Sequence, residues 1–144
     1  MIHEDTIKLL RECDAGIKMG VASLDDVLGA VRSEELKKLL QSSKEHHQSL
    51  GTEILAALDR FHDDGKNPNP IAKGMSKMKT SMKLTLEDSD ATVADLMVSG
   101  CDMGVRSLSR YLNQYKAADE DSKDIAKRLI RIESQLSTDL RPYL

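Results

Sequence analysis

Apolar residues recur three and four positions apart over four long segments of the chain, the spacing that lines one face of an α-helix. These stripes predict helices over about residues 3–30, 33–63, 90–116 and 120–141. A helix of ~25 residues is about 38 Å long, so each segment is long enough to span a single domain. Runs of β-branched and aromatic residues, which are typical of strands, are missing. The pattern therefore predicts an all-α protein.

Polar residues mark where these helices begin and end. Ser33, followed by two glutamates, predicts an N-cap with acids at the positive end of the helix dipole. Asp90 is expected to cap the third long helix and Asp119 to open the fourth. The second helix is expected to end at Asp64, just before a glycine. Short turns between consecutive helices make them antiparallel neighbours.

The connection between the second and third long helices is about 27 residues, too long for a hairpin turn. It begins with the proline-rich sequence KNPNP and continues into a segment, about residues 71–87, that we expect to form a short crossover helix. An apolar stripe runs along this segment, with most of its lysines away from the stripe: Ile71, Met75, Met78, Met82 and Leu86 against Lys73, Lys77, Lys79 and Lys83. Such a helix is favoured to lie over the bundle with its lysines in water. The alternative is that it binds a membrane surface or an acidic partner.

Length and charge limit the classes of function. A chain of 144 residues fits one domain with its own core, so residues 1–144 are expected to form a single bundle. The formal net charge of -3 gives no general attraction for nucleic acid. The two cysteines have none of the spacings of zinc sites or redox pairs, which favours a reduced, cytoplasmic setting. No segment has the ~18 to 20 apolar residues of a membrane-spanning helix.

A short motif appears twice, 88 residues apart: Cys13 begins CDAGIK and Cys101 begins CDMGVR. We interpret the chain as two related helical hairpins joined by the crossover, with coincidence as the alternative. Two glycines lie one turn apart near each copy of the motif: Gly16 and Gly20, and Gly100 and Gly104. Each interior helical glycine costs up to about 1 kcal/mol relative to alanine, so these positions need a local reason. We expect them to let two helices approach closely, inside the bundle rather than between chains.

Several motifs together resemble an uncharacterised bacterial family of ferritin-like four-helix proteins. They are the Asp and Gly early in the first helix, the SEEL opening of the second, the long crossover, and GCDMGVRSLSRYLNQY ahead of AKRLIRIESQLSTDLRPYL. The resemblance extends over nearly the whole chain. It implies a ferritin-like antiparallel four-helix bundle with one long crossover, and a bundle centre in which a di-iron site is expected.

A di-iron bundle needs several inward-facing carboxylates and Glu-x-x-His motifs, a pattern that is mostly absent here. The candidate ligands of a degenerate site, for iron or another divalent metal, are Asp14, His47, Asp102 and Glu133. The favoured interpretation is instead a buried polar cluster in which His47 pairs with Asp14 or Asp102 and bonds Ser43. Neither cysteine has a neighbouring base that would activate it, so both are interpreted as small packing residues.

The leading hypothesis is therefore a non-catalytic bundle with a structural or protein-interaction role, without a cofactor and self-associating, for example as a dimer, through a helix face. The alternative is a metal-binding protein or oxidase built on the degenerate site. A third hypothesis is an adaptor whose crossover helix, rich in Lys and Met, binds a protein partner.

Overall fold

The computed structural model describes residues 2–144, and these contain five α-helices and no strand. The helices are α1 (Ile2–Leu28), α2 (Glu34–Asp59), α3 (Pro70–Leu86), α4 (Asp90–Gln114) and α5 (Glu120–Leu140), followed by a single 3₁₀ turn, η1 (Arg141–Tyr143). The all-α prediction is confirmed, and the predicted helices match α1, α2, α4 and α5 within a few residues. The expected crossover helix is α3. None of the helices in residues 2–144 is both long and apolar enough to cross a membrane.

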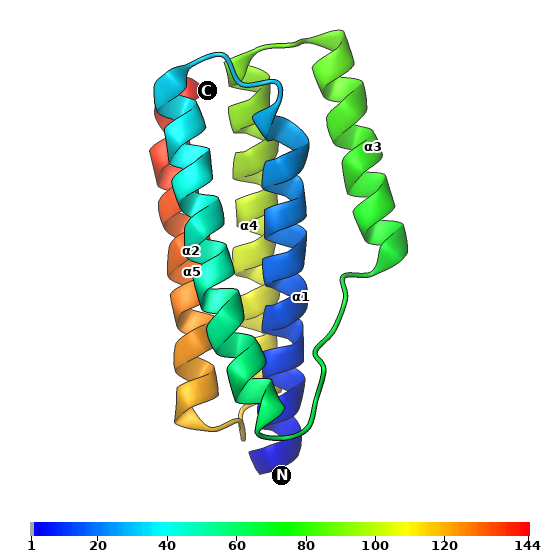
Figure 1. Ribbon diagram of the computed structural model, residues 1–144, viewed down its shortest axis with the longest axis vertical. Helices are drawn as coiled ribbons and strands as arrows, with labels where there is room; N and C mark the ends of the chain where they lie inside the picture. Colours follow the sequence, from blue (N-terminus) through cyan, green and yellow to red (C-terminus); the bar gives the residue numbers. More distant parts are fainter. Residues whose placement is uncertain (1) are drawn as a thin grey trace.

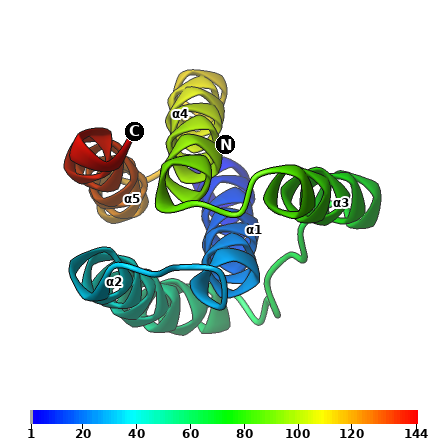
Figure 2. The same ribbon diagram turned by 90° about the horizontal axis from the view of Figure 1, so that it is seen from above.

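The four long helices lie side by side as a bundle, with α3 outside it (Figure 1). α1 runs upward in this view, α2 and α4 run downward, and α5 runs upward again. α1 packs against α2 and α4, and α5 also packs against both of these helices. Each of these neighbouring pairs is antiparallel, while α1 and α5 touch as a parallel pair across the bundle. The view from above places α3 next to α1, on the side away from α2 and α5 (Figure 2).

Local hydrogen bonds explain the observed helix ends. Ser33 caps α2 and Asp119 caps α5, as predicted. The cap of α4 is Ser89 rather than Asp90, whose carboxylate instead accepts hydrogen bonds from the backbone amides of Arg32 and Ser33. Asp90 therefore ties the start of α4 to the turn between α1 and α2. The second helix ends at Asp59, about one turn earlier than predicted.

The core of the bundle is divided into two apolar clusters. One lies towards the N-terminus of α1 and contains Leu9, Leu10, Cys13, Ile17, Leu50, Ile54, Leu58, Leu108, Ala118, Ile125, Ala126 and Leu129. The other lies towards the C-terminus of α1 and contains Leu24, Val27, Leu36, Leu40, Val93, Ala94, Met97, Cys101, Leu136 and Leu140. Along every long helix, the residue between the two clusters is a glycine or a polar residue: Gly20, His47, Gly104 and Glu133.

Helix α3 differs from the expectation that only its lysines would face water. It has 17 residues and none of them is buried. Its partly buried residues are Ser76, Thr80 and Leu84, which recur four apart and therefore share one side of the helix. The apolar stripe lies on the opposite side and is exposed. The expected packing of this stripe onto the bundle is therefore wrong, because mostly small polar residues take the side that contacts α1 and α4.

A buried polar layer as the candidate functional site

His47 and Glu133 form a buried pair in the layer between the two apolar clusters. The ring Nε2 of His47 is 2.8 Å from Glu133 Oε1, and its Nδ1 is 2.7 Å from the backbone carbonyl oxygen of Ser43. His47 is 1% exposed and Glu133 is 8% exposed. The pair joins α2 to α5 across the bundle, and each nitrogen of the ring has an oxygen partner.

The hydrogen-bond partners of His47 favour the protonated ring. Burial alone lowers the pKa of His47, but the hydrogen bond and charge of Glu133 and the carbonyl of Ser43 outweigh burial, so the net shift of the pKa is upward from 6.5. In the imidazolium form Nδ1 donates to the Ser43 carbonyl and Nε2 donates to the Glu133 carboxylate. The pair is thus an ion pair with charge-assisted hydrogen bonds.

Two glycines provide the space that this pair occupies. A Cβ atom at Gly20 would lie 2.9 Å from Cδ2 and 3.0 Å from Nε2 of the His47 ring. A Cβ at Gly104 would meet Glu133 Cδ at 3.5 Å, an ordinary contact distance. The glycine at position 20 is therefore required by the imidazole, whereas the glycine at position 104 has room for a methyl group.

The prediction that these glycines allow close contacts between helices inside the bundle is confirmed at Gly20 and does not hold at Gly100, while a Cβ at Gly16 would make an ordinary contact of 3.6 Å with Leu129 of α5. Gly20 on α1 faces a side chain of α2, Gly104 on α4 faces a side chain of α5, and at Gly100 a methyl group would have no atom within 4 Å. A second tight contact between α1 and α2 lies at Gly51, whose Cβ would lie 3.0 Å from Cγ2 of Ile17. Gly51, which was not singled out in the sequence, therefore marks the contact of α1 and α2 together with Gly20.

Cys101 adjoins the pair from α4. Burial, the charge of Glu133 and a hydrogen bond to Glu133 all raise the pKa of the Cys101 thiol. Burial likewise raises the pKa of the Cys13 thiol to about 12, and this residue lies in the other apolar cluster. The thiolate is the reactive form of cysteine, so both positions disfavour nucleophilic chemistry, in agreement with their interpretation as packing residues.

Asp14 is buried, but it serves a different purpose from His47. Its Oδ2 lies 2.9 Å from Lys18 Nζ and accepts a hydrogen bond of 2.9 Å from the backbone amide of Lys66. Gly65, with φ of +92°, passes so close that a Cβ there would lie 2.2 Å from the same oxygen. Asp14 therefore fastens the start of the crossover to α1.

Asp102 is exposed, and its Oδ1 accepts a hydrogen bond of 3.3 Å from the Ser137 hydroxyl. Of the four candidate ligands, the structure thus brings together only His47 and Glu133. The expected pairing of His47 with Asp14 or Asp102 is wrong, because Asp14 is engaged by the crossover and Asp102 lies on the surface. The expected contact of His47 with Ser43 is confirmed, through the backbone carbonyl.

The donor set does not fit a di-iron site. Within residues 2–144 no group of three or more His, Cys, Asp or Glu side chains is placed to hold a metal ion. Both ring nitrogens of His47 are already bonded to protein oxygens, so metal binding would require one of these bonds to break. In the same part of the chain, every buried side-chain nitrogen or oxygen has a hydrogen-bond partner. The layer is therefore a satisfied polar cluster.

Two shallow grooves lie on the described surface, and neither reaches the pair. One, of about 370 Å³, lies between α2 and α5 and is lined by residues such as Ser43, His46, Ile132 and Leu136. The other, of about 640 Å³, separates α1 from the crossover and the start of α3. His47 and Glu133 line neither groove, so a small molecule in either one would not touch the ion pair.

The sequence marks both His47 and Glu133 as candidate ligands but does not pair them with each other. The sequence feature that could have paired them is an interruption near the middle of each apolar stripe. Gly20, His47, Gly104 and Glu133 are these interruptions, so the four residues are expected at the same height along the bundle. No family model, curated protein or solved structure matches the chain. The likeness to ferritin-like proteins therefore stays a resemblance carried by the sequence motifs.

Proposed function

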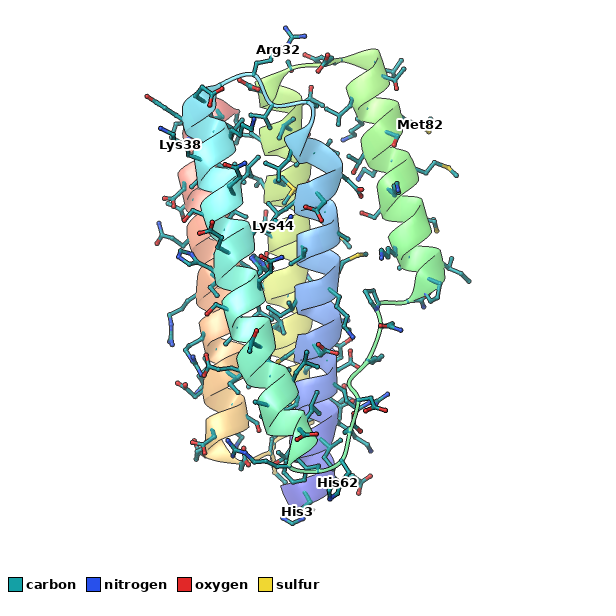
Figure 3. All side chains as sticks on the ribbon, viewed as in Figure 1. His3, Arg32, Lys38, Lys44, His62 and Met82 are labelled. Carbon is teal, nitrogen blue, oxygen red and sulfur yellow. The ribbon has the colours of Figure 1, made fainter. Side chains whose placement is uncertain are left out.

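We propose that this protein is a non-catalytic bundle of ferritin-like topology that acts as a docking module through α3. The observation that carries the proposal is the exposure of five large apolar side chains on one helix. Ile71, Met75, Met78, Met82 and Leu86 are between 59% and 84% exposed. Figure 3 shows Met82 directed away from the bundle. Contiguous exposed apolar surface of this kind marks interaction sites.

The interior of the bundle supports a structural role rather than catalysis. Its titratable groups act on one another: the His47 ring bonds Glu133, and the charge of the same carboxylate adds to burial in raising the pKa of the Cys101 thiol. Burial and hydrogen bonding leave neither the ring nor the thiol directed at a groove. This arrangement is suited to fixing the register of the helices.

Methionine suits a docking surface because its flexible, polarizable side chain adapts to different partners. Of the described residues outside α3, the large apolar side chains that are exposed are Leu55, Met103 and Leu144. They lie on α2, on α4 and at the C-terminus, and so do not form a second stripe.

Self-association also stays a prediction, and α3 is a poor face for it. Two α3 stripes brought together would place two sets of four lysines side by side without an acidic residue on either helix. Like charges that lie side by side destabilise the contact between the two helices that carry them.

The test compares the wild-type chain with Met75→Gln/Met78→Gln/Met82→Gln in capture experiments with cell lysate and with lipid extract. Met103→Gln is the matched control, because Met103 is 70% exposed but lies on α4. We expect the triple variant to lose what the wild type captures and the control to retain it. Unfolding of the triple variant in urea should follow the wild type, since none of these side chains is buried. Unchanged capture by the triple variant would refute the proposal.

A further inference from the structure

We infer that α3 lies on an anionic lipid surface, with its apolar stripe inserted between headgroups and Lys79 and Lys83 beside lipid phosphates. The inference rests on the proposed function and names the chemistry of the partner. It depends on three features of α3: the direction of the stripe, the charge of the helix, and the small extent of the exposed apolar surface.

The stripe is oriented so that a flat surface can reach it. The side of α3 that contacts the bundle carries Ser76, Thr80 and Leu84, and the stripe lies on the opposite side. α3 is also the outermost helix in the view from above (Figure 2). A planar surface can therefore contact the whole stripe without meeting α2, α4 or α5.

The charge of α3 is separated from the charge of the bundle. The helix has four lysines and no acidic residue, a charge of +4, which leaves -7 on the rest of a chain whose total is -3. The negative total therefore conceals a strongly basic helix. An anionic surface attracts α3 and repels the remainder, which orients the molecule with α3 towards the lipid.

Two of the four lysines, Lys79 and Lys83, flank the stripe, whereas Lys73 and Lys77 lie towards the side of α3 that carries Thr80. Lys79 is three and four residues from Met82 and Met75, so it adjoins the stripe directly. All four lysines are exposed, and only Lys83 has an acidic residue near it, with 3.8 Å from its Nζ to Asp95 Oδ2. A helix is about 10 to 12 Å across and the Debye length is about 8 Å at physiological salt, so Lys79 and Lys83 experience the surface charge more strongly than the two lysines on the far side of α3.

The small extent of the stripe favours lipid over a protein interface. A helix of 17 residues presents a face of roughly 26 Å by 10 Å, about 260 Å². A stable protein interface buries about 800 Å² on each partner, several times the area of this face. An interfacial helix needs no shape-complementary groove, because lipids adapt around its apolar side chains.

The experiment measures binding of the full chain to vesicles by co-sedimentation. One set of vesicles is phosphatidylcholine alone and the other is phosphatidylcholine with phosphatidylglycerol. We expect binding only to the second set, and weaker binding as salt is raised. Lys79→Glu/Lys83→Glu should weaken binding by at least about 25-fold, since each lysine near an anionic surface accounts for about fivefold.

Two controls separate the roles of the stripe and the charges. Lys37→Glu/Lys38→Glu makes the same change in charge on exposed positions of α2 and should weaken binding far less. Met75→Gln/Met78→Gln/Met82→Gln should abolish insertion, whereas Met103→Gln should not. Circular dichroism and urea unfolding confirm that each variant is folded.

Absence of binding to the anionic vesicles, or equal loss with the α2 and α3 charge variants, would overturn the lipid inference. If a protein is still captured through α3 in that case, the proposed docking function stands with a different partner. A dimer that dissociates on substitution of the α3 methionines would likewise replace lipid by a second copy of the chain. If neither lipid nor protein binds through α3, the inference and the proposed function both fail.

Discussion

Substitution of Gly20 by alanine tests whether the His47 ring is held where the structure places it. In an open helix interior, glycine to alanine stabilises by about 1 kcal/mol, because alanine loses less backbone entropy. At position 20 the added Cβ would lie 2.9 Å from Cδ2 and 3.0 Å from Nε2 of His47. Carbon atoms prefer separations of about 3.5 to 4.0 Å, so the ring must move by at least roughly half an ångström.

The ring cannot move without cost, since it is held by oxygens on both sides, at 2.7 and 2.8 Å. Overpacking costs about 1 to 3 kcal/mol, and weakening a hydrogen bond to a charged group costs about 1.5 to 3 kcal/mol. The two costs together are about 2.5 to 6 kcal/mol, so after the helix-propensity gain of about 1 kcal/mol is subtracted we expect Gly20→Ala to destabilise by about 1.5 to 5 kcal/mol. Gly100→Ala, where no atom lies within 4 Å of the new methyl, should stabilise by up to about 1 kcal/mol.

Urea unfolding, followed by circular dichroism, measures both variants against the wild type. The coupling is measured by repeating Gly20→Ala in a His47→Ala background, with Gly100→Ala added to all chains if extra stability is needed. Without the ring, alanine at position 20 should become stabilising. If Gly20→Ala were as stable as Gly100→Ala, or equally harmful with and without His47, the packing argument for the polar layer would be refuted.

Three further predictions concern the same interior. Glu133→Leu should lower the free energy of unfolding by about 3 to 5 kcal/mol, because it leaves a buried imidazolium unpaired. His47→Leu/Glu133→Leu removes both charges and should be near neutral or stabilising. A double variant less stable than Glu133→Leu would contradict this reasoning. The pKa of His47 is raised above 6.5 in the folded state, so between about pH 6.5 and the folded pKa the folded protein holds a proton that the unfolded chain has released. The free energy of unfolding should therefore fall as pH rises through this range. The slope should be at most about 1.4 kcal/mol per pH unit. His47→Gln should remove this slope and His46→Gln, at an exposed position, should not. The Cys13 and Cys101 thiols should not react with Ellman's reagent in the folded protein, since burial raises the pKa of each. Both should react in urea. Rapid labelling without denaturant would show that the core is open.

The helices could be predicted because each long segment repeats one apolar stripe that has to face a common interior. Their ends were less certain, since Ser89 and Asp90 are both good caps and only the tertiary bonds of Asp90 to the preceding turn decide between them. The end of α2 is predicted too late because Gly65 suggests the position just after a helix, whereas the chain already leaves the helical conformation at His62, whose φ is +56°.

The candidate site was harder to predict than the fold. Asp14 and His47 lie on the inner faces of their helices, so the sequence allows both to join one cluster. It does not show that the Asp14 carboxylate pairs with Lys18 and accepts a hydrogen bond from the backbone amide of Lys66 in the crossover. Glu133 could not be matched with His47 from periodicity, because that match depends on the level of α2 relative to α5. The direction of the α3 stripe could not be predicted either, since a helix with one apolar face and one small polar face can turn either face towards its bundle.

The buried polar layer and the exposed α3 stripe affect different properties of this molecule: the first its folding free energy, the second its binding to partners if the proposal is right. The polar layer lies inside the bundle, where any change to Gly20, His47 or Glu133 alters folding. The α3 stripe contributes no buried residue, so its substitution should change binding and leave folding alone. The crossover is nevertheless anchored at its start, where Asp14 holds the amide of Lys66, so α3 is presented in a fixed place beside α1. If α3 is the docking surface that we propose, that surface can vary in sequence while the core stays constant, because no residue of the stripe is part of the core.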